Sequence, residues 1–552
     1  MIPFKDVHSW VGGHKENEPE LDADYGDVIS FHERLKAYCQ ENDKDLWFVM
    51  NGDWIDGTGL AMDGDSSHVI PILEKMPFDV VNTGNHELYR STVVEYMTRP
   101  GGFIDWWGDK YLASNVLLAR TKQSLSNRYI VLEGRNSNVL VFGFLYNLPN
   151  PSEVVIVAEV EKVVKEKWFQ EALKTERFDS IMIMAHMAYD DPLVVVLLTE
   201  IRVHVGHDMP VQFVTGHTHY RRYMELDPLS TSFEAGRYLD TVGFVSFPIK
   251  ETASAAGENA SDLFRHVFID ANVKVLQETL GVEKLRTESG NELSTFIQHT
   301  QEEMGLKEHI GCTPRTYYLN RSMFAEDSSL WKLYKDEVVP SQLDVDPRTK
   351  KAIFLGQGSW RYDLLRGKEP LEVDDIIAVS PFNEPIVFLG KFPGSIVLLL
   401  NESMNQEPSN VMPDLPRHIL AGSVSTDDDC MLYTHHHEVL EILETLRMLY
   451  TGDIPEPQIT NMTSTSVWMQ FVKHQWPCEG AGLPWLHDSN ISKEQAVDDA
   501  QTILIVFAFL SLAFSFGGML CLLGMCCKRA RLNPEYHYDV QDIILEEHCE
   551  LT

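Results

Sequence analysis

Thr83-Gly84-Asn85-His86-Glu87 follows the apolar run Phe78-Asp79-Val80-Val81. A short run of this kind predicts a buried strand. Asn85 and His86 would then lie in the loop after that strand, where open α/β sheets place their catalytic groups. An asparagine offers a neutral oxygen to a metal ion, and the neighbouring histidine can donate a proton. The stretch therefore predicts a site at one edge of a sheet.

Four more apolar runs before residue 220 end in side chains of the same kind. Mixed oxygen and imidazole ligands suit Zn, Mn or Fe better than Ca or a structural thiolate site. A shared aspartate can also bridge two ions about 3.5–4 Å apart, the arrangement used in phosphoryl chemistry. The runs are followed by Asp6-Val7-His8, by Asn51-Gly52-Asp53-Trp54-Ile55-Asp56, by His186, and by Thr215-Gly216-His217-Thr218-His219.

In this order, the motifs DxH, GDxxD, GNHE, a lone His and GHxH resemble the calcineurin-like metallophosphoesterase superfamily, over about the first 250 residues. The resemblance implies an α/β fold in which a β-sandwich is flanked by helices. It also implies that His86 is the proton donor or stabilises the transition state. Two divalent ions of the Zn, Mn or Fe class would be held, one by Asp6, His8, Asp53 and His219, the other by Asp53, Asn85, His186 and His217.

The chain is most similar to the 5'-nucleotidase branch, with two departures. Ser9 replaces the glycine that usually follows DxH, and Tyr89 stands where the branch has an aspartate that pairs with the catalytic histidine. Asp56, the second aspartate of GDxxD, is inferred to orient His86 instead, because a carboxylate can fix an imidazole. The alternative is that Asp56 is only a turn residue before Gly57.

A chain of 552 residues is too long for one ordinary core, so at least two domains are expected. Residues 1–250 would form the phosphoesterase domain, 251–310 a helical bridge and 311–450 a second α/β domain. Helices are predicted over Tyr25–Gln40, Pro151–Lys174 and Asp327–Val338. A stalk over 451–501 is predicted from its Pro, Thr, Ser and Trp content.

The second domain resembles the C-terminal domain of 5'-nucleotidases through Lys351–Arg361 and then Pro381-Phe382-Asn383. The resemblance implies that Arg361 holds the substrate phosphate or linking group and that Phe382 stacks on the base. Phe382 could instead be ordinary core. The family's leading asparagine and second stacking phenylalanine are missing, so nucleoside recognition stays open. His435-His436-His437 lies near the family's last strand, as a substrate contact or a solvated surface run.

The 26 residues from Thr502 to Cys527 carry no charge and exceed the roughly 20 apolar residues that span a bilayer. Lys528 and Arg529 follow, which places residues 528–552 in the cytosol of a single-pass type I protein. Four cysteines before the span could form two disulfides in three ways. Five glycosylation motifs also precede it, at Asn259, Asn320, Asn401, Asn461 and Asn490.

The tail contains Asn533-Pro534-Glu535-Tyr536, which resembles an NPxY internalisation signal, and the pair Ile543-Ile544 after acidic residues. An endocytic adaptor is therefore expected as a partner, with the protein at the plasma membrane or an endolysosomal or vacuolar membrane. A chance match in an acidic tail is the alternative. Residues 1–5 are no signal peptide, so an incomplete or processed start is expected.

The formal charge of −36 argues against nucleic acid as a partner. The favoured function is hydrolysis of phosphate esters, with nucleotides as the expected substrates. Metal-bound hydroxide would attack phosphorus and His86 would protonate the leaving oxygen. The alternatives are a sugar-nucleotide or cyclic-nucleotide phosphodiesterase and a catalytically silent receptor-like ectodomain, against which the complete ligand set argues. A homodimer stays open.

Overall fold

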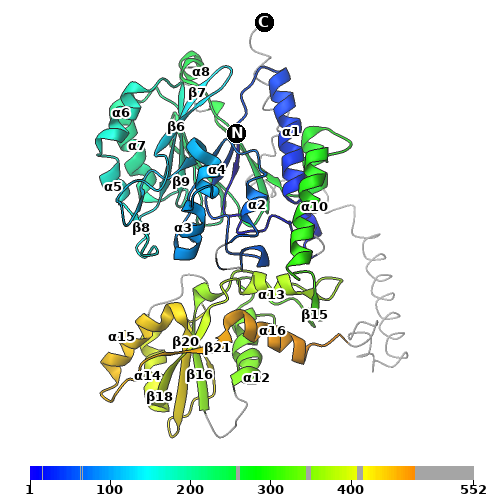
Figure 1. Cartoon of the computed structure of the whole chain (residues 1–552), viewed down its shortest axis with the longest axis vertical. Helices are drawn as coiled ribbons and strands as arrows, with labels where there is room; N and C mark the ends of the chain where they lie inside the picture. Colours follow the sequence, from blue (N-terminus) through cyan, green and yellow to red (C-terminus); the bar gives the residue numbers. More distant parts are fainter. Residues whose placement is uncertain are drawn as a thin grey trace, which may run out of the picture.

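The structure is a computed structural model that describes residues 1–478 apart from 15–16, 63, 65, 257–261, 344–349 and 407–413. Figure 1 shows two domains, with the C-terminal one in yellow and orange below the N-terminal one. The predicted span over 502–527, the tail, Asn259 and Asn490 lie outside the described residues. Within the described part of the chain, no helix combines the length and apolar character that crossing a bilayer requires.

The N-terminal domain contains two main sheets. The first is fully parallel, in the order β1 (Ile2–Phe4), β2 (Phe48–Asn51), β3 (Val80–Asn82) and β4 (Tyr111–Leu112). The second has a parallel centre with antiparallel edge strands. Its order is β11 (Arg221–Asp227), β12 (Ser230–Ala235), β10 (Val211–Val214), β9 (Ser180–His186), β7 (Asn138–Leu145) and β6 (Tyr129–Glu133).

Two antiparallel strand pairs complete this domain. The antiparallel pair β13 (Thr241–Ser246) and β14 (Arg265–Asp270) lies beside β1, because the Met1 amine donates to the Val245 carbonyl at 2.9 Å and the Val245 amide donates back to Met1. The other pair is β5 (Val116–Leu118) with β8 (Val155–Val157).

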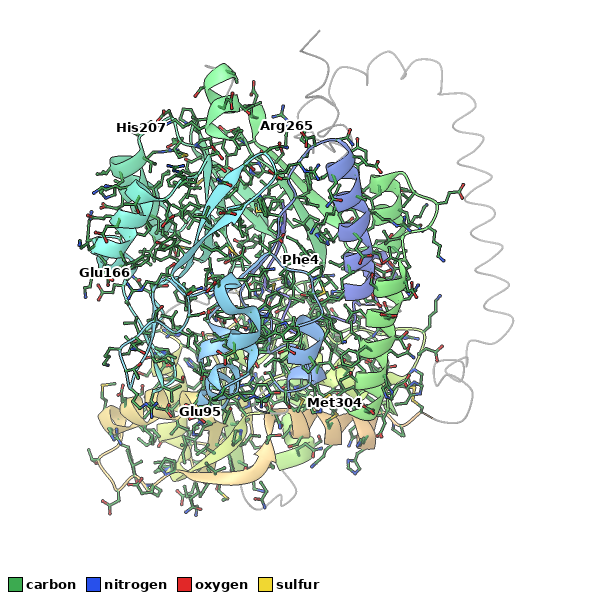
Figure 2. All side chains as sticks on the ribbon, turned by 45° about the horizontal axis from the view of Figure 1, so that its top comes forward. Phe4, Glu95, Glu166, His207, Arg265 and Met304 are labelled. Carbon is green, nitrogen blue, oxygen red and sulfur yellow. A yellow bond between two sulfur atoms is a disulfide. The ribbon has the colours of Figure 1, made fainter. Side chains whose placement is uncertain are left out.

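Alternation along the strands explains how the two sheets stack. Val141 points into the layer between the sheets, where it packs with Val49, Val80 and Met184, whereas Phe142 points outward to the helices. The outer face of the first sheet buries Phe4, which Figure 2 places inside the domain. This layered arrangement confirms the predicted α/β sandwich.

Helices cover both outer faces of the sandwich (Figure 1). On the first sheet pack α1 (Tyr25–Glu41), α2 (Ile70–Leu73), α9 (Val273–Leu280) and α10 (Glu288–Glu303), and on the second pack α5 (Val160–Val163), α6 (Lys167–Thr175) and α7 (Pro192–Val205). The remaining helices of the domain are α3 (Ser91–Thr98), α4 (Phe103–Trp107) and α8 (Lys250–Ala256).

The prediction for Tyr25–Gln40 is confirmed, because α1 begins there behind a capping box in which Asp24 accepts from the Asp27 amide at 3.0 Å. A single helix over Pro151–Lys174 is wrong. The β-branched residues of β8 pair with β5 instead, and the helical part is split into α5 and α6. The bridge is also split, because Gly281 ends α9 in the left-handed conformation and Thr287 caps α10.

The C-terminal domain is built on a mixed five-stranded sheet. Its order is β19 (His418–Gly422), β16 (Lys350–Gly356), β20 (Asp429–His435), β18 (Pro385–Pro393) and β21 (Gln458–Thr463). A small pair, β15 (His309–Gly311) with β17 (Leu371–Glu372), borders it. Packed on the sheet are α11 (Leu330–Leu333), α12 (Val339–Leu343), α13 (Val373–Val379), α14 (Gly394–Met404), α15 (Val439–Leu449) and α16 (Ser464–Gln475).

Two predictions for this domain change. The stretch Asp327–Val338 is helical only from Leu330, where α11 continues into a π-helical turn. Residues 458–475 are not a stalk: β21 pairs with β18, and Trp468 of α16 is fully buried. The apolar residues spaced along α16 explain why this helix packs into the domain, which the local Pro, Thr and Ser content did not indicate. The domain therefore extends to Cys478, which forms a disulfide with Cys312, while Cys39 and Cys430 are buried.

Candidate active site

The predicted metal ligands all lie at the carboxyl ends of parallel strands. Asp6 and His8 follow β1, Asp53 follows β2, Asn85 follows β3, His186 ends β9, and His217 and His219 follow β10. Five of them have φ between 48° and 75°, a conformation that non-glycine residues adopt rarely. Hydrogen bonds between the loops stabilise this backbone conformation. The Asp6 amide donates to the Gly52 carbonyl at 3.1 Å, and the His8 amide donates to the Asp53 carbonyl at 3.0 Å.

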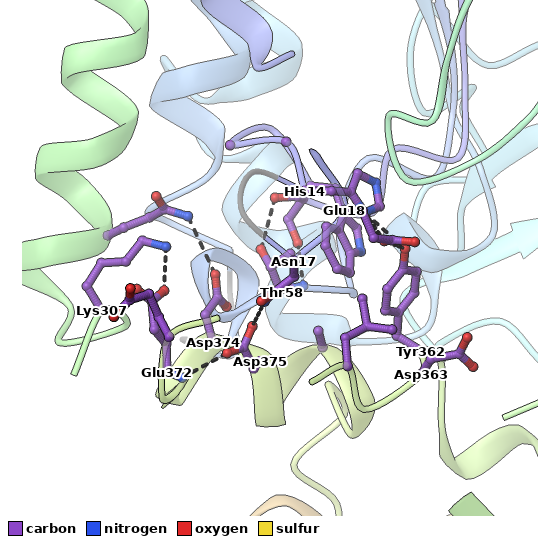
Figure 3. A pocket seen from close by; sticks show the side chains of 18 of the residues that line it. His14, Asn17, Glu18, Thr58, Lys307, Tyr362, Asp363, Glu372, Asp374 and Asp375 are labelled. Atoms are coloured by element: carbon purple, nitrogen blue, oxygen red, sulfur yellow. Dashed lines mark hydrogen bonds and ion pairs between the residues drawn. The ribbon is translucent and has the colours of Figure 1, made fainter. Parts of the chain in front are cut away.

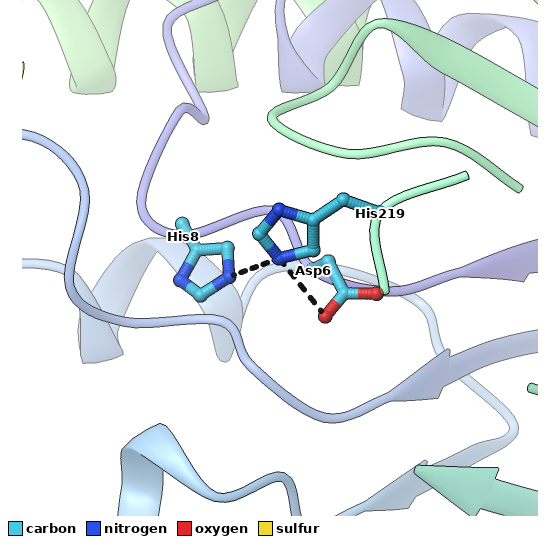
Figure 4. A group of neighbouring side chains, drawn as sticks. All are labelled: Asp6, His8 and His219. Atoms are coloured by element: carbon cyan, nitrogen blue, oxygen red, sulfur yellow. Dashed lines mark hydrogen bonds and ion pairs between the residues drawn. The ribbon is translucent and has the colours of Figure 1, made fainter. Parts of the chain in front are cut away.

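One group of ligands consists of Asp6, His8 and His219 (Figure 4). The Nε2 atoms of His8 and His219 face each other at 3.2 Å, and Asp6 Oδ1 lies 3.6 Å from Nε2 of His219. Burial holds the pKa of both histidines well below the ordinary value, so both rings are neutral. Neutral imidazole nitrogens beside a carboxylate form a donor set for a divalent ion.

The other group consists of Asp53, His186 and His217. Nε2 of His186 lies 3.0 Å from Asp53 Oδ2, and Nε2 of His8 lies 3.8 Å from the same oxygen. Asp53 therefore lies between the two groups, as a shared ligand must. Burial alone would raise the pKa of Asp53, but the charges of His186 and His86 outweigh it and hold the pKa well below its usual value.

Beside this group, Oδ1 of Asn85 is buried without a hydrogen-bond partner among the described residues, and Nε2 of His186 has only the Asp53 carboxylate within hydrogen-bond distance, at 3.0 Å. Such atoms cost about 1–3 kcal/mol each when unsatisfied. Despite burial, the Asp53 carboxylate raises the pKa of His186 to about 10, so the ring itself can carry the positive charge that this carboxylate attracts. A metal ion at this place would replace that proton and satisfy both atoms.

Backbone carbonyls orient the ligand rings. Nδ1 of His8 lies 2.9 Å from the Ile55 carbonyl, and Nδ1 of His186 lies 2.7 Å from the Asn51 carbonyl. Because a carbonyl oxygen only accepts, each Nδ1 must carry a hydrogen. In each ring Nε2 is thereby left to face the carboxylates, which is the arrangement found around metal-binding histidines.

His86 is held by the carboxylate of Asp56. Nδ1 of His86 lies 3.0 Å from Asp56 Oδ2, while Arg90 donates to Asp56 Oδ1 at 2.6 Å. Asp56 is 4% exposed, so it is more than a turn residue. Burial raises its pKa, but Arg90 and His86 outweigh burial and lower it. Tyr89, at the position of the family's aspartate, accepts from Asn85 Nδ2 at 3.1 Å instead.

The C-terminal domain brings its two predicted residues to the same histidine. Arg361 contacts Nε2 of His86 through its guanidinium, and the Phe382 ring stacks on the His86 ring with centroids 6.1 Å apart and planes 15° apart. The Arg361 guanidinium also lies 5.2 Å from the centre of the Phe382 ring. Phe382 is half-buried and faces the site rather than the domain core.

Several residues that matter to the site were not predicted. Lys5 is buried and pairs with Asp6 at 2.8 Å and with Glu234 at 3.0 Å. Arg90 neutralises Asp56, and no sequence signal links them. Glu87 belongs to the GNHE motif, and its buried carboxylate accepts the amides of Gly84, Asp53 and Trp54 at 2.8–2.9 Å. Burial, and then the charge of Asp53, raises its pKa to about 8.

A cavity of about 400 Å³ lies between the domains beside these residues, and none of the predicted ligands lines it (Figure 3). At one side Tyr362 donates to the Glu18 carboxylate, which His14 also contacts at 2.8 Å. Asn17 donates to Asp375 at 2.9 Å. These polar contacts fix the position of the chain next to Arg361.

Comparison with known proteins assigns both domains. Residues 6–221 match the family model of calcineurin-like phosphoesterases, and residues 316–443 match that of the NAD nucleotidase C-terminal domain. The chain therefore contains a calcineurin-like phosphoesterase domain, followed by a domain of the NAD nucleotidase C-terminal type. This phosphoesterase is a hydrolase, and side chains of its N-terminal domain form three overlapping groups that can hold divalent metals.

The chain is similar to proteins of several fungi. An uncharacterized protein of Saccharomyces cerevisiae is 29% identical over 419 residues, which cover 70% of this chain and 67% of the relative. A protein of Arthroderma benhamiae named as secreted is 25% identical over 449 residues, 73% of this chain and 66% of its own length.

Among solved structures, the 5'-nucleotidase of Candida albicans matches with a TM-score of 0.77 at 24% identity, over 86% of this phosphoesterase and 97% of that chain. A 5'-nucleotidase precursor from Thermus thermophilus matches with a TM-score of 0.60 at 14% identity, over 87% and 96%. At these identities the likeness concerns the fold.

Glu87→Ala is expected to lower the free energy of unfolding by more than about 3 kcal/mol, because three buried amides lose their acceptor. Glu87→Gln keeps one accepting oxygen and should cost less. Denaturant unfolding of the phosphoesterase measures both. The control is Glu95→Ala, at an exposed position of α3, with a change within about 0.5 kcal/mol. Equal stability of the Glu87→Ala and Glu95→Ala variants would contradict the role given to Glu87.

Proposed function

We propose that the chain hydrolyses phosphate esters of nucleotides at a site that holds two divalent metal ions. The observation that carries this proposal is the meeting of two domains at His86: Arg361 and Phe382 contact it from one domain, and both ligand groups adjoin it in the other. An arginine and an aromatic ring suit a ligand with a phosphate and a base. The fold shared with 5'-nucleotidases supports the same substrate class.

One ion would be held by Asp6, His8, Asp53 and His219, and the other by Asp53, Asn85, His186 and His217. The residues fit this assignment, because the unsatisfied Oδ1 of Asn85 and Nε2 of His186 face it and the donor set is mixed oxygen and imidazole. That donor set suits Zn, Mn or Fe. Bound ions would supply Lewis acidity toward phosphate oxygens and water.

His86 would supply the proton for the leaving oxygen. Asp56 accepts from Nδ1 and fixes the plane of the ring, and Arg90 holds the Asp56 carboxylate in turn. Nε2 is then the only ring nitrogen that faces the substrate, and it is the atom that Arg361 contacts. A proton on Nε2 can pass to the leaving alkoxide, while Nδ1 stays hydrogen-bonded to Asp56.

Arg361 would bind the phosphate that is cleaved. Its guanidinium contacts His86 in the structure, so a phosphate ester placed between the two side chains would take both as partners. The Phe382 ring lies beside this place, stacked on His86 and next to the Arg361 guanidinium. A nucleobase could stack on its other face, which would put the ester linkage near Nε2 of His86.

The same proposal places the described part of the chain outside the cytosol. The disulfide Cys312–Cys478 is typical of oxidising compartments, Asn320 and Asn461 are exposed, and one relative is named as secreted. Residues 502–527 would anchor the protein in the plasma membrane or an endolysosomal or vacuolar membrane, and Tyr536 would meet an endocytic adaptor.

The full chain is expected to hydrolyse a nucleoside monophosphate only when a divalent metal is present. Asp53→Asn should lower kcat/KM by about 100-fold or more, because the shared ligand loses its charge. The measurement is phosphate release, with metal content determined on the same samples. Asp208→Asn, at an exposed carboxylate of the same domain, is the control and should act as wild type. Absence of phosphate release from metal-replete wild type would favour the silent ectodomain.

Asp56→Asn is expected to lower kcat about 100-fold while the metal content stays unchanged, because Asp56 acts on His86 and not on a metal. Arg90→Gln should have a smaller effect in the same direction. Steady-state kinetics together with metal analysis tells whether Asp56 orients His86 or supports the loops that bind the metals. Loss of metal from Asp56→Asn would mean that Asp56 supports the ligand loops.

Phe382→Ala is expected to raise KM for a nucleotide about 5- to 100-fold, because base stacking contributes about 1–3 kcal/mol. KM for a small aliphatic phosphate ester should change little, since that substrate has no base. Both values come from initial rates on one preparation. Similar changes for both substrates would assign Phe382 to domain packing.

A further inference from the structure

A separate cluster of metal-ligand side chains lies in the C-terminal domain. One ligand atom from each of Glu384, His435 and His437 lies within 4.8 Å of the others. Sheet pairing brings them together, because β18 and β20 are antiparallel with Ile386 opposite His435. Glu384 precedes β18, His435 ends β20, and His437 lies in the one-turn helix that follows.

Each imidazole of the cluster has one nitrogen held by a neighbour and the other left for the cluster. Nδ1 of His435 lies 3.1 Å from the Ser359 hydroxyl, and its Nε2 is buried without a hydrogen-bond partner among the described residues. Nε2 of His437 lies 3.2 Å from Glu438, and its Nδ1 contacts the Glu384 carboxylate. His8 and His186 show the same division of their two nitrogens in the N-terminal domain.

An ion pair does not explain the whole cluster. A protonated His437 gives a partner to one carboxylate oxygen of Glu384 and one of Glu438. It leaves Nε2 of His435 unsatisfied in a residue that is only 1% exposed, at a cost of about 1–3 kcal/mol. A divalent ion would replace the proton of His437 and give that nitrogen a partner.

We propose that Glu384, His435 and His437 bind a zinc-class divalent ion in addition to the two ions of the N-terminal site. Two imidazoles and one carboxylate are a donor set that zinc takes in proteins. Glu438 would hold the ring of His437 from behind, as carboxylates do at zinc sites. The side chain of His437 is 42% exposed, so solvent can complete the coordination.

The ion would join the two segments that carry the substrate residues. Ser359, which holds His435, is two residues before Arg361, and Glu384 is two residues after Phe382. The cluster therefore ties the turn after β16 to the loop before β18. This positioning effect rests on the proposed function, whereas binding of the ion does not.

The test is the zinc content of the purified full chain loaded with zinc and freed of excess metal. His437→Gln and Glu384→Gln are each expected to lose about one zinc per chain relative to wild type. His436→Ala is the matched control, because His436 is the exposed neighbour outside the cluster, and it should lose none. Asp53→Asn should retain this zinc. Wild-type zinc content in a folded His437→Gln chain would overturn the proposal and leave an ion pair only.

If the His437 and Glu384 variants fold poorly, a second measurement tests whether this ion binds. Cobalt added to the Asp53→Asn chain is expected to give the visible absorption of a nitrogen- and oxygen-coordinated ion, and zinc should abolish it. Absence of a zinc-displaceable band would overturn the proposal. Wild type without phosphatase activity but with the third zinc would refute the proposed function alone. Loss of the third zinc should raise KM for the nucleotide more than it lowers kcat.

Discussion

The site depends on the close approach of the loops after β2 and β3. A Cβ atom on Gly52 would lie 2.4 Å from the Gly84 nitrogen, and one on Gly84 would lie 2.2 Å from Oδ1 of Asp53. Only glycine at both positions permits this contact. The contact lets Asp53 accept the His86 amide at 2.9 Å while its other oxygen faces His186. One carboxylate thereby links His86 to both ligand groups.

Charge is distributed around this carboxylate in a way that keeps it buried and ionised. Lys5 forms an ion pair with Asp6, and Arg90 forms one with Asp56. The imidazoles of His186 and His8 lie next to Asp53. The remaining buried carboxylate, Glu87, is satisfied by backbone amides rather than by a cation. A centre of this kind attracts cations, and bound cations would let an acidic chain take a negatively charged phosphate ester.

Much of the fold and the placement of the ligands could be predicted because parallel strands put their carboxyl ends at one edge. That rule brings Asp6, Asp53, Asn85, His186 and His217 to one edge, while the division into two ligand sets came from the family resemblance. The Lys5–Glu234 pair could not be found, because its partners are 229 residues apart and meet only through tertiary packing. Residues 151–174 were misread because β-branched residues that suit a strand also fit a helical period. Residues 458–475 looked like a linker because their composition hid the apolar face of α16.

The disulfide Cys312–Cys478 also determines how the molecule transmits force. It joins the first and last parts of the C-terminal domain across 166 residues. Tension applied at residue 478 would enter the backbone at Cys312 and continue toward α10, so the five-stranded sheet between the two cysteines would carry none of it. The domain that supplies Arg361 and Phe382 would keep its shape under a pull at this end, while strain would fall on the segment that joins it to the sandwich.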